Sequence, residues 1–250
     1  MRNTTENATQ AGISRIAGFS YLAIIAAGIL SHFVIRGSLI KPDDAEATVQ
    51  NIMDAETLFR ISIAGDIVML LFDVIVGVAL FMLFRSVSPG LAILATSFRI
   101  VHAAVYGATL LSLIVIAVLV RGTSNLSASE TALVQTFADV HALGYAMALV
   151  FFAFSLLAVG YLVLKSGAVP AIIGGLLAFA GAGYLLDSFA QILLTNYADY
   201  EDVLGVVVFL PAIIGELSFA LWLLVKGIPA RQQSDTPSRS FAATADSRAV

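Results

Sequence analysis

The chain has 250 residues, of which 59% are hydrophobic and only 12% are charged, with a net charge of −4 and no cysteine. A soluble domain carries roughly a quarter charged residues, so a water-soluble core could not hide this much apolar surface. The composition excludes disulfides, thiolate catalysis and cysteine-ligated metals, and no basic patch indicates nucleic-acid binding. It predicts an all-α polytopic membrane protein whose first partner is the lipid bilayer.

Six apolar segments are each long enough to cross a hydrocarbon layer about 30 Å thick, which takes about twenty helical residues. Residues 1–13 form a polar tail before the first segment, and residues 229–250 are expected to be a disordered tail. A transmembrane domain of six helices is therefore expected over residues 14–228. In chain order, the spans are predicted at residues 14–36, 58–85, 90–120, 137–165, 169–194 and 203–226.

Two connecting segments carry helix signals of their own. Residues 41–44, Lys-Pro-Asp-Asp, look like a helix start and precede an apolar stripe, which predicts a short amphipathic helix in the first outer loop. Such a helix would rest on lipid headgroups or act as a lid. Farther along, Ser127 and Glu130 fit a capping box, so the fourth span is expected to begin before residue 137.

The fifth span carries small residues at helical spacing. Gly174, Ala178 and Ala182 lie four apart, and a ridge of this kind lets a neighbouring helix approach closely. We expect this ridge to be a packing surface.

Cations gather at the end of the predicted bundle that also holds both chain termini. The cations at this end are Arg2, Arg15, Arg85, Lys165, Lys226 and Arg231. Those at the opposite end are Lys41, Arg60 and Arg121. The positive-inside rule therefore predicts cytoplasmic termini, and the acidic loops of the other end favour a neutral or cationic ligand.

Ionisable side chains inside the spans are the most informative residues, because each costs about 2.5–3.5 kcal/mol in the membrane. Their depth follows from a helical rise of about 1.5 Å per residue. A layer about 13–18 Å from the end with the termini holds Asp73, Arg99, His102 and Glu216. A second layer, about 27 Å or more from that end, holds His32, Asp66, Asp139, His141 and Asp187.

The deep layer contains an arginine that needs a partner. Arg99 and His102 share a helix face with Tyr106, and the short turn between the second and third spans brings Asp73 level with His102. A buried arginine keeps its proton and requires a carboxylate. Asp73 and Glu216 are both candidates, and the match in depth favours Glu216. The pair could be a helix-to-helix tie alone, or part of a ligand site.

Three functions fit these residues. In the first, the bundle binds or passes a small ligand through an outward-facing polar cavity lined by Asp66, Asp73, Arg99, His102, Tyr106, Asp187 and Glu216. In the second, it is an enzyme on a lipid-like substrate that uses carboxylates and histidines as general acid and base, or as metal ligands. The residues with suitable metal-ligand chemistry are His32, Asp66, His141 and Asp187. In the third, it is an accessory membrane subunit. No spacing motif supports a metal, and no motif requires a cofactor.

Five segments of the chain resemble recurring segments of a known family. They are LFRISIAGDIVMLLFDV, SFRIVHAAVYG, DVHALGYAMALVFF, GAGYLLDSF and GELSFALWLLVKG. They look like the bacterial membrane proteins of domain of unknown function family 4386, and the resemblance extends from Ser14 to Gly227. It implies a protein of the bacterial inner membrane and brings with it no activity or site residues.

Overall fold

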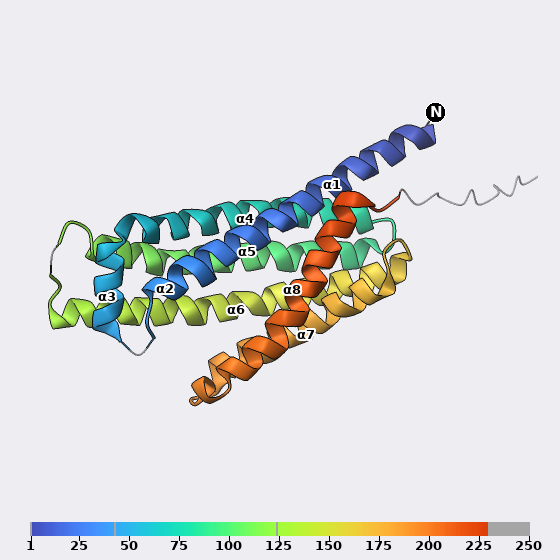
Figure 1. Ribbon diagram of the computed structural model, residues 1–250. Helices are drawn as coiled ribbons and strands as arrows, with labels where there is room; N and C mark the ends of the chain where they lie inside the picture. Colours follow the sequence, from blue (N-terminus) through green and yellow to red (C-terminus); the bar gives the residue numbers. More distant parts are fainter. Residues whose placement is uncertain (1, 43, 124, 230–250) are drawn as a thin grey trace, which may run out of the picture.

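The computed structural model describes residues 2–42, 44–123 and 125–229. Every element in these ranges is a helix, and together the helices form an elongated bundle (Figure 1). The tail expected to be disordered, residues 229–250, lies outside the described residues from position 230 onward.

Within the described ranges, six helices are long and apolar enough to cross a membrane, which confirms the predicted all-α bundle. The first span consists of α1 (Arg2–Gly28), η1 (Ile29–Arg36) and α2 (Gly37–Leu39). The other spans are α4 (Glu56–Phe84), α5 (Pro89–Leu119), α6 (Ala128–Ser166), α7 (Ala171–Leu193) and α8 (Glu201–Val225). The chain is therefore a multi-pass membrane protein.

The first span differs from its prediction at both ends. α1 begins at Arg2 and not near residue 14, so residues 2–13 are helical. At the other end the backbone forms η1, a π-helix of eight residues, before a last short turn of α-helix. Long π-helical runs are rare, and π-helical turns occur frequently at functional sites.

Helices that follow one another along the chain pack side by side, and α8 completes the arrangement by packing against α1. The start of α1 and the last turn of α8 lie at the same end of the bundle, which we call the terminal end (Figure 1). The opposite end carries α3 (Ala45–Asp54) and we call it the α3 end.

The helix α3 occupies the loop in which an amphipathic helix is expected. Asp44 caps it, since its carboxylate accepts a hydrogen bond of 2.8 Å from the backbone N–H of Ala47. Val49 and Ile52 are buried, and α3 packs mainly against α6. Its apolar stripe is therefore covered by protein at the α3 end and not by lipid headgroups.

The fourth span begins early, as its capping box predicts. The side chain of Ser127 accepts from the backbone of Glu130, and the carboxylate of Glu130 accepts from the backbone N–H of Ser127 at 2.7 Å. This start makes α6 the longest helix of the described chain, at 39 residues.

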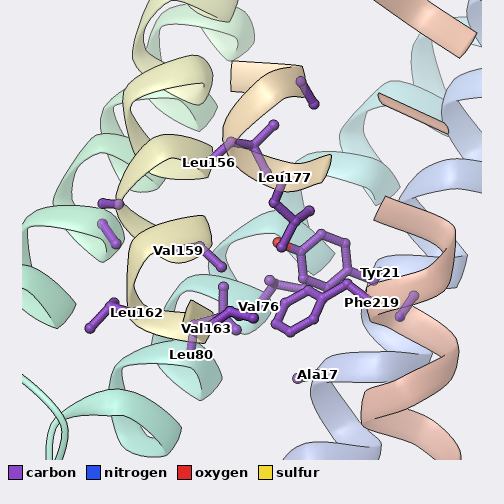
Figure 2. Packing of buried hydrophobic residues seen from close by; sticks show 14 of the residues in the cluster. Ala17, Tyr21, Val76, Leu80, Leu156, Val159, Leu162, Val163, Leu177 and Phe219 are labelled. Carbon is purple, nitrogen blue, oxygen red and sulfur yellow. The ribbon is translucent and has the colours of Figure 1, made fainter. Parts of the chain in front are cut away.

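The core of the terminal half joins all six spans. Tyr21 of α1 and Phe219 of α8 meet edge to face at 5.7 Å, and Val76, Leu156 and other buried aliphatic side chains fill the space beside them (Figure 2). Dense packing of this kind fixes the relative positions of the helices that carry the deep polar layer.

Small residues bring α6 and α7 into backbone contact. A Cβ built on Gly160 would stand 2.8 Å from the carbonyl oxygen of Gly174 and 2.8 Å from the backbone nitrogen of Ala178. The predicted ridge is right for these two positions and wrong for the third. Ala182 is exposed, whereas Gly181 faces α6, because a straight helical face advances by three or four residues.

Candidate functional site

A cavity of about 120 Å³ lies inside the bundle, and every one of the six spans contributes to its wall. Its polar lining residues are His32, Asp66, Asp73, His102, Tyr106, Tyr145, Tyr184 and Glu216. Its apolar lining residues are Ile24, Ile25, Gly28, Ile29, Phe33, Met69, Leu149, Phe152, Phe209 and Ile213. The predicted site residues Asp66, Asp73, His102, Tyr106 and Glu216 are thus brought together at one cavity.

Arg99, which is predicted to line the cavity, is not among its lining residues, and it pairs with Asp73, which is. Its Nη2 atom is 2.7 Å from Oδ1 of Asp73, and its Nη1 donates a hydrogen bond of 2.9 Å to the hydroxyl of Tyr21. The guanidinium also lies 4.7 Å from the ring centre of Tyr21 and 5.1 Å from that of Phe152. The depth match that favours Glu216 as the partner is therefore wrong. Depth alone does not say which way a side chain points around its helix.

Asp73 also holds His102, as the short turn between α4 and α5 predicts. Its Oδ2 atom lies 3.0 Å from Nδ1 of His102. An ionised carboxylate can only accept, so Nδ1 donates to it, and the tautomer with its proton on Nδ1 presents a lone pair at Nε2. His102 is only 5% exposed, and Nε2 has no hydrogen-bond partner among the described residues. A carboxylate-oriented imidazole with a free Nε2 is suited to accept a hydrogen bond or a proton from a ligand.

Glu216 contributes the second carboxylate of the deep layer. Its Oε1 atom accepts a hydrogen bond of 3.2 Å from the hydroxyl of Tyr184. No arginine or lysine of the described chain lies within ion-pair distance of it. Two carboxylates, Asp73 and Glu216, therefore accompany one arginine in this layer.

The layer near the α3 end is organised by Arg36, which the sequence reasoning did not single out. Arg36 is only 3% exposed and forms an ion pair with Asp66. Its Nη2 atom donates to the hydroxyl of Tyr106 at 3.3 Å and lies 3.2 Å from Nδ1 of His32. A first span predicted to end at residue 36 places this arginine at the boundary, whereas the observed helix continues to Leu39 and buries it. The spacing of His32 and Arg36, four residues apart, is the sequence signal for their shared face.

Asp187 does not reach the cavity. Its carboxylate accepts hydrogen bonds from the hydroxyl of Tyr197 at 2.8 Å and from the side-chain amide of Gln191 at 3.0 Å. Burial and the hydrogen bond to Asp187 raise the pKa of Tyr197, so its hydroxyl remains protonated and able to donate. Asp187 thus ties the end of α7 to the loop before α8.

The residues with metal-ligand chemistry do not form a metal-binding group. Asp66 is engaged by Arg36, Asp187 by Tyr197, and Nδ1 of His141 lies 3.3 Å from the carbonyl oxygen of Thr109. In residues 2–42, 44–123 and 125–229, no three His, Cys, Asp or Glu side chains are grouped so that they could hold a metal ion. The four candidates named from the sequence do not form one site.

The cavity wall reaches the surface of the bundle at the first span and at α8. The lining residues that are most exposed lie on these two elements: Ile29 is 43% exposed, Phe33 is 55% exposed and Ile213 is 40% exposed. Surfaces of this composition on a membrane-spanning helix face lipid. We call this exposed side of the cavity the lateral window. The sequence predicts a cavity mouth on the outward side, which is the α3 end when the termini are cytoplasmic. The ion pair of Arg36 and Asp66 lies on that side of the cavity.

The lateral window has a boundary at each end. Toward the terminal end, α1 and α8 cross so closely that a Cβ on Gly18 would stand 2.7 Å from the carbonyl oxygen of Ala220. From this crossing the two helices diverge (Figure 1). Toward the α3 end, the rings of Phe33 and Phe209 meet edge to face with their centres 5.8 Å apart.

Comparison with known proteins gives one family and one relative. The model of the family described as domain of unknown function (DUF4386) matches residues 16–227. A protein of Archaeoglobus fulgidus named "Uncharacterized protein" is 32% identical over 176 residues, which cover 70% of this chain and 90% of that protein. No solved structure matches the chain. The matched region contains the first span from residue 16 onward, the other five spans and the whole cavity wall, and the chain therefore belongs to the DUF4386 family.

Proposed function

We propose that this protein binds a small amphipathic molecule that it takes sideways from the lipid bilayer. The observation that carries the proposal is the lateral window, which connects a mixed polar and apolar cavity with the lipid-facing surface of the bundle. Ligand sites are concave and mostly apolar, with a few polar groups that fix the orientation of the ligand.

The wall of the cavity is divided in a way that suits an amphipathic molecule. Ile29, Phe33 and Ile213 form the window, whereas His102 and Glu216 lie at the deep wall. A molecule already dissolved in the bilayer would place its polar group against the deep wall and leave its chain in the window. Its apolar part would then remain in an apolar medium throughout, so entry would cost little desolvation.

The window can be tested by filling it. Ile213→Trp adds a large ring at the mouth, and Ile214→Trp is the matched control, because Ile214 is 48% exposed and does not line the cavity. The probe is a ten-carbon alcohol with a photoreactive diazirine beside its hydroxyl group, added to vesicles that contain the protein. In the parent and in Ile214→Trp, we expect labelling of cavity residues such as Phe152. In Ile213→Trp, this labelling should fall about tenfold or more, equal to about 1.4 kcal/mol of binding free energy.

Peptide mapping by mass spectrometry locates the label. Labelling confined to lipid-facing positions of the parent would contradict the proposal. So would cavity labelling that is equal in Ile213→Trp and Ile214→Trp. An accessory subunit without a ligand predicts the first of these results.

The proposed topology places both termini in the cytoplasm of a cell with an inner membrane. In its support, Arg15, Arg85, Lys165 and Lys226 belong to the terminal end, against Lys41, Arg60 and Arg121 at the α3 end. Cytoplasmic loops carry an excess of such cations. With this topology, the lateral window lies between the helix crossing at Gly18 and the outer surface of the membrane.

Single cysteines test this topology, because the chain has none of its own. Ser129→Cys, at the α3 end, should react with a membrane-impermeant maleimide in intact cells. Ser86→Cys, in the turn after α4 at the terminal end, should react only after the membrane is opened. Both serines are exposed. The reverse pattern of labelling would place the termini outside.

A further inference from the structure

From the charges and rings at the deep wall of the cavity, we infer that the ligand carries a protonated amine. This inference rests on the proposed function and names the class of its ligand. Its first support is a surplus of negative charge. Among the described residues, three carboxylates line the cavity, those of Asp66, Asp73 and Glu216, and only two arginines pair with them.

Among the described residues, Glu216 is the lining carboxylate without an ion-pair partner. Arg36 is engaged by Asp66, and Arg99 by Asp73 and Tyr21. The hydrogen-bond partner of Glu216 in the described chain is neutral, the hydroxyl of Tyr184. A carboxylate out of water is stable when it is paired, and a ligand ammonium would supply the pairing charge.

The surroundings of Glu216 are aromatic. Tyr184, its hydrogen-bond partner, lies edge to face with Phe152 at 5.7 Å and with Phe209 at 5.9 Å, and all three rings line the cavity. Aromatic faces attract ammonium groups through their quadrupole, and this attraction is strongest where water is excluded. Arg99 already lies over Phe152, so Tyr184 and Phe209 are the rings available to a ligand.

His102 provides an acceptor for the ammonium hydrogens. Its Nε2 atom is buried at the cavity wall and has no hydrogen-bond partner in the described chain, and it can accept when the proton is on Nδ1 beside Asp73. Glu216 and His102 together therefore offer two acceptors and a negative charge. This set favours a protonated primary amine over an alcohol of the same size, and it disfavours a carboxylate or phosphate.

The test is a competition against the photoreactive ten-carbon alcohol. Decylamine, which is protonated at pH 7, and 1-decanol differ only in the head group. They are added to protein in vesicles of neutral phosphatidylcholine, so that the membrane charge does not favour the amine. In the parent protein, we expect decylamine to displace the label at a concentration about tenfold lower than 1-decanol does.

Three variants test which residues cause the preference for the amine over the alcohol. Glu216→Gln should abolish the preference for the amine and keep the alcohol in the cavity. Phe209→Leu should weaken the preference without a change of charge, and it serves if Glu216→Gln does not fold. Glu201→Gln is the matched control in the exposed first turn of α8, and it should behave like the parent.

The outcomes separate this inference from the proposed function. If the alcohol labels the cavity and both competitors displace it equally, the amine inference is wrong and the lateral site stands. An unchanged preference in Glu216→Gln would also overturn it. If the alcohol does not label the cavity at all, the proposed function itself is wrong.

Discussion

Replacing Arg99 by methionine is expected to lower the free energy of unfolding by about 3–5 kcal/mol. The variant leaves Asp73 buried in the membrane layer without its cation, and the cost of an unpaired buried charge exceeds the value of the pair itself. The loss would be measured by unfolding in mixed detergent micelles, with helical circular dichroism as the signal.

A double variant distinguishes the cost of the unpaired charge on Asp73 from the cost of losing the packing of the Arg99 side chain. Adding Asp73→Asn to Arg99→Met removes the uncompensated charge and keeps a hydrogen-bonding group beside His102. We expect it to regain most of the lost stability. The control is Glu56→Gln, which removes the charge from the partly exposed ion pair with Arg60 and should cost less than about 1 kcal/mol. Equal losses in Glu56→Gln and Arg99→Met would show that Arg99 is not held in a buried pair.

Replacing Gly18 by leucine is expected to separate α1 from α8 and to cost about 1–3 kcal/mol of stability. Even a single Cβ at this position would stand 2.6 Å from the backbone nitrogen of Leu224, so one of the helices must move. The crossing at Gly18 is the boundary of the lateral window, and the movement should therefore widen the window. The distance between two spin labels would measure this widening. The labels are attached to Leu30→Cys on η1 and Leu210→Cys on α8, and both positions are exposed.

Gly12 on the same helix provides the control for this prediction. A Cβ at Gly12 meets nothing within 4 Å, so Gly12→Leu should leave both the stability and the distance between the labels unchanged. Electron spin resonance between the two labels measures the distance without interference, since the chain contains no other cysteine. The same stability and distance in Gly18→Leu as in Gly12→Leu would show that the crossing is not tight.

The six spans could be predicted because a single physical quantity, the length of an apolar run, decides them. α4, α5 and α7 begin and end within about two residues of their predicted bounds, because turn residues such as Pro89 and Gly167 mark the ends of neighbouring helices. The capping pair Ser127 and Glu130 likewise gave the early start of α6. Both signals act between residues that are close in the chain, so the packing of distant helices does not change them.

The partners within the polar layers could be predicted only in part. Asp73 and His102 lie on helices joined by a short turn, which constrains their relative height and facing, and they are indeed in contact. Glu216 and Arg99 match in depth, but α8 and α5 are joined by no turn, and the rotation of α8 directs Glu216 to Tyr184. The burial of Arg36 could not be predicted, because it depends on the continuation of the first span as a π-helix, for which no sequence rule is available.

The π-helical segment η1 also links the backbone geometry of the first span to the direction of its side chains. Each turn of a π-helix holds about one residue more than a turn of α-helix, so each residue advances less around the helix axis. A substitution that returned residues 29–36 to α geometry at the same length would therefore rotate these side chains. Arg36 would turn away from Asp66, and Phe33 away from Phe209. The lateral window and the buried ion pair thus depend on one irregular stretch of backbone.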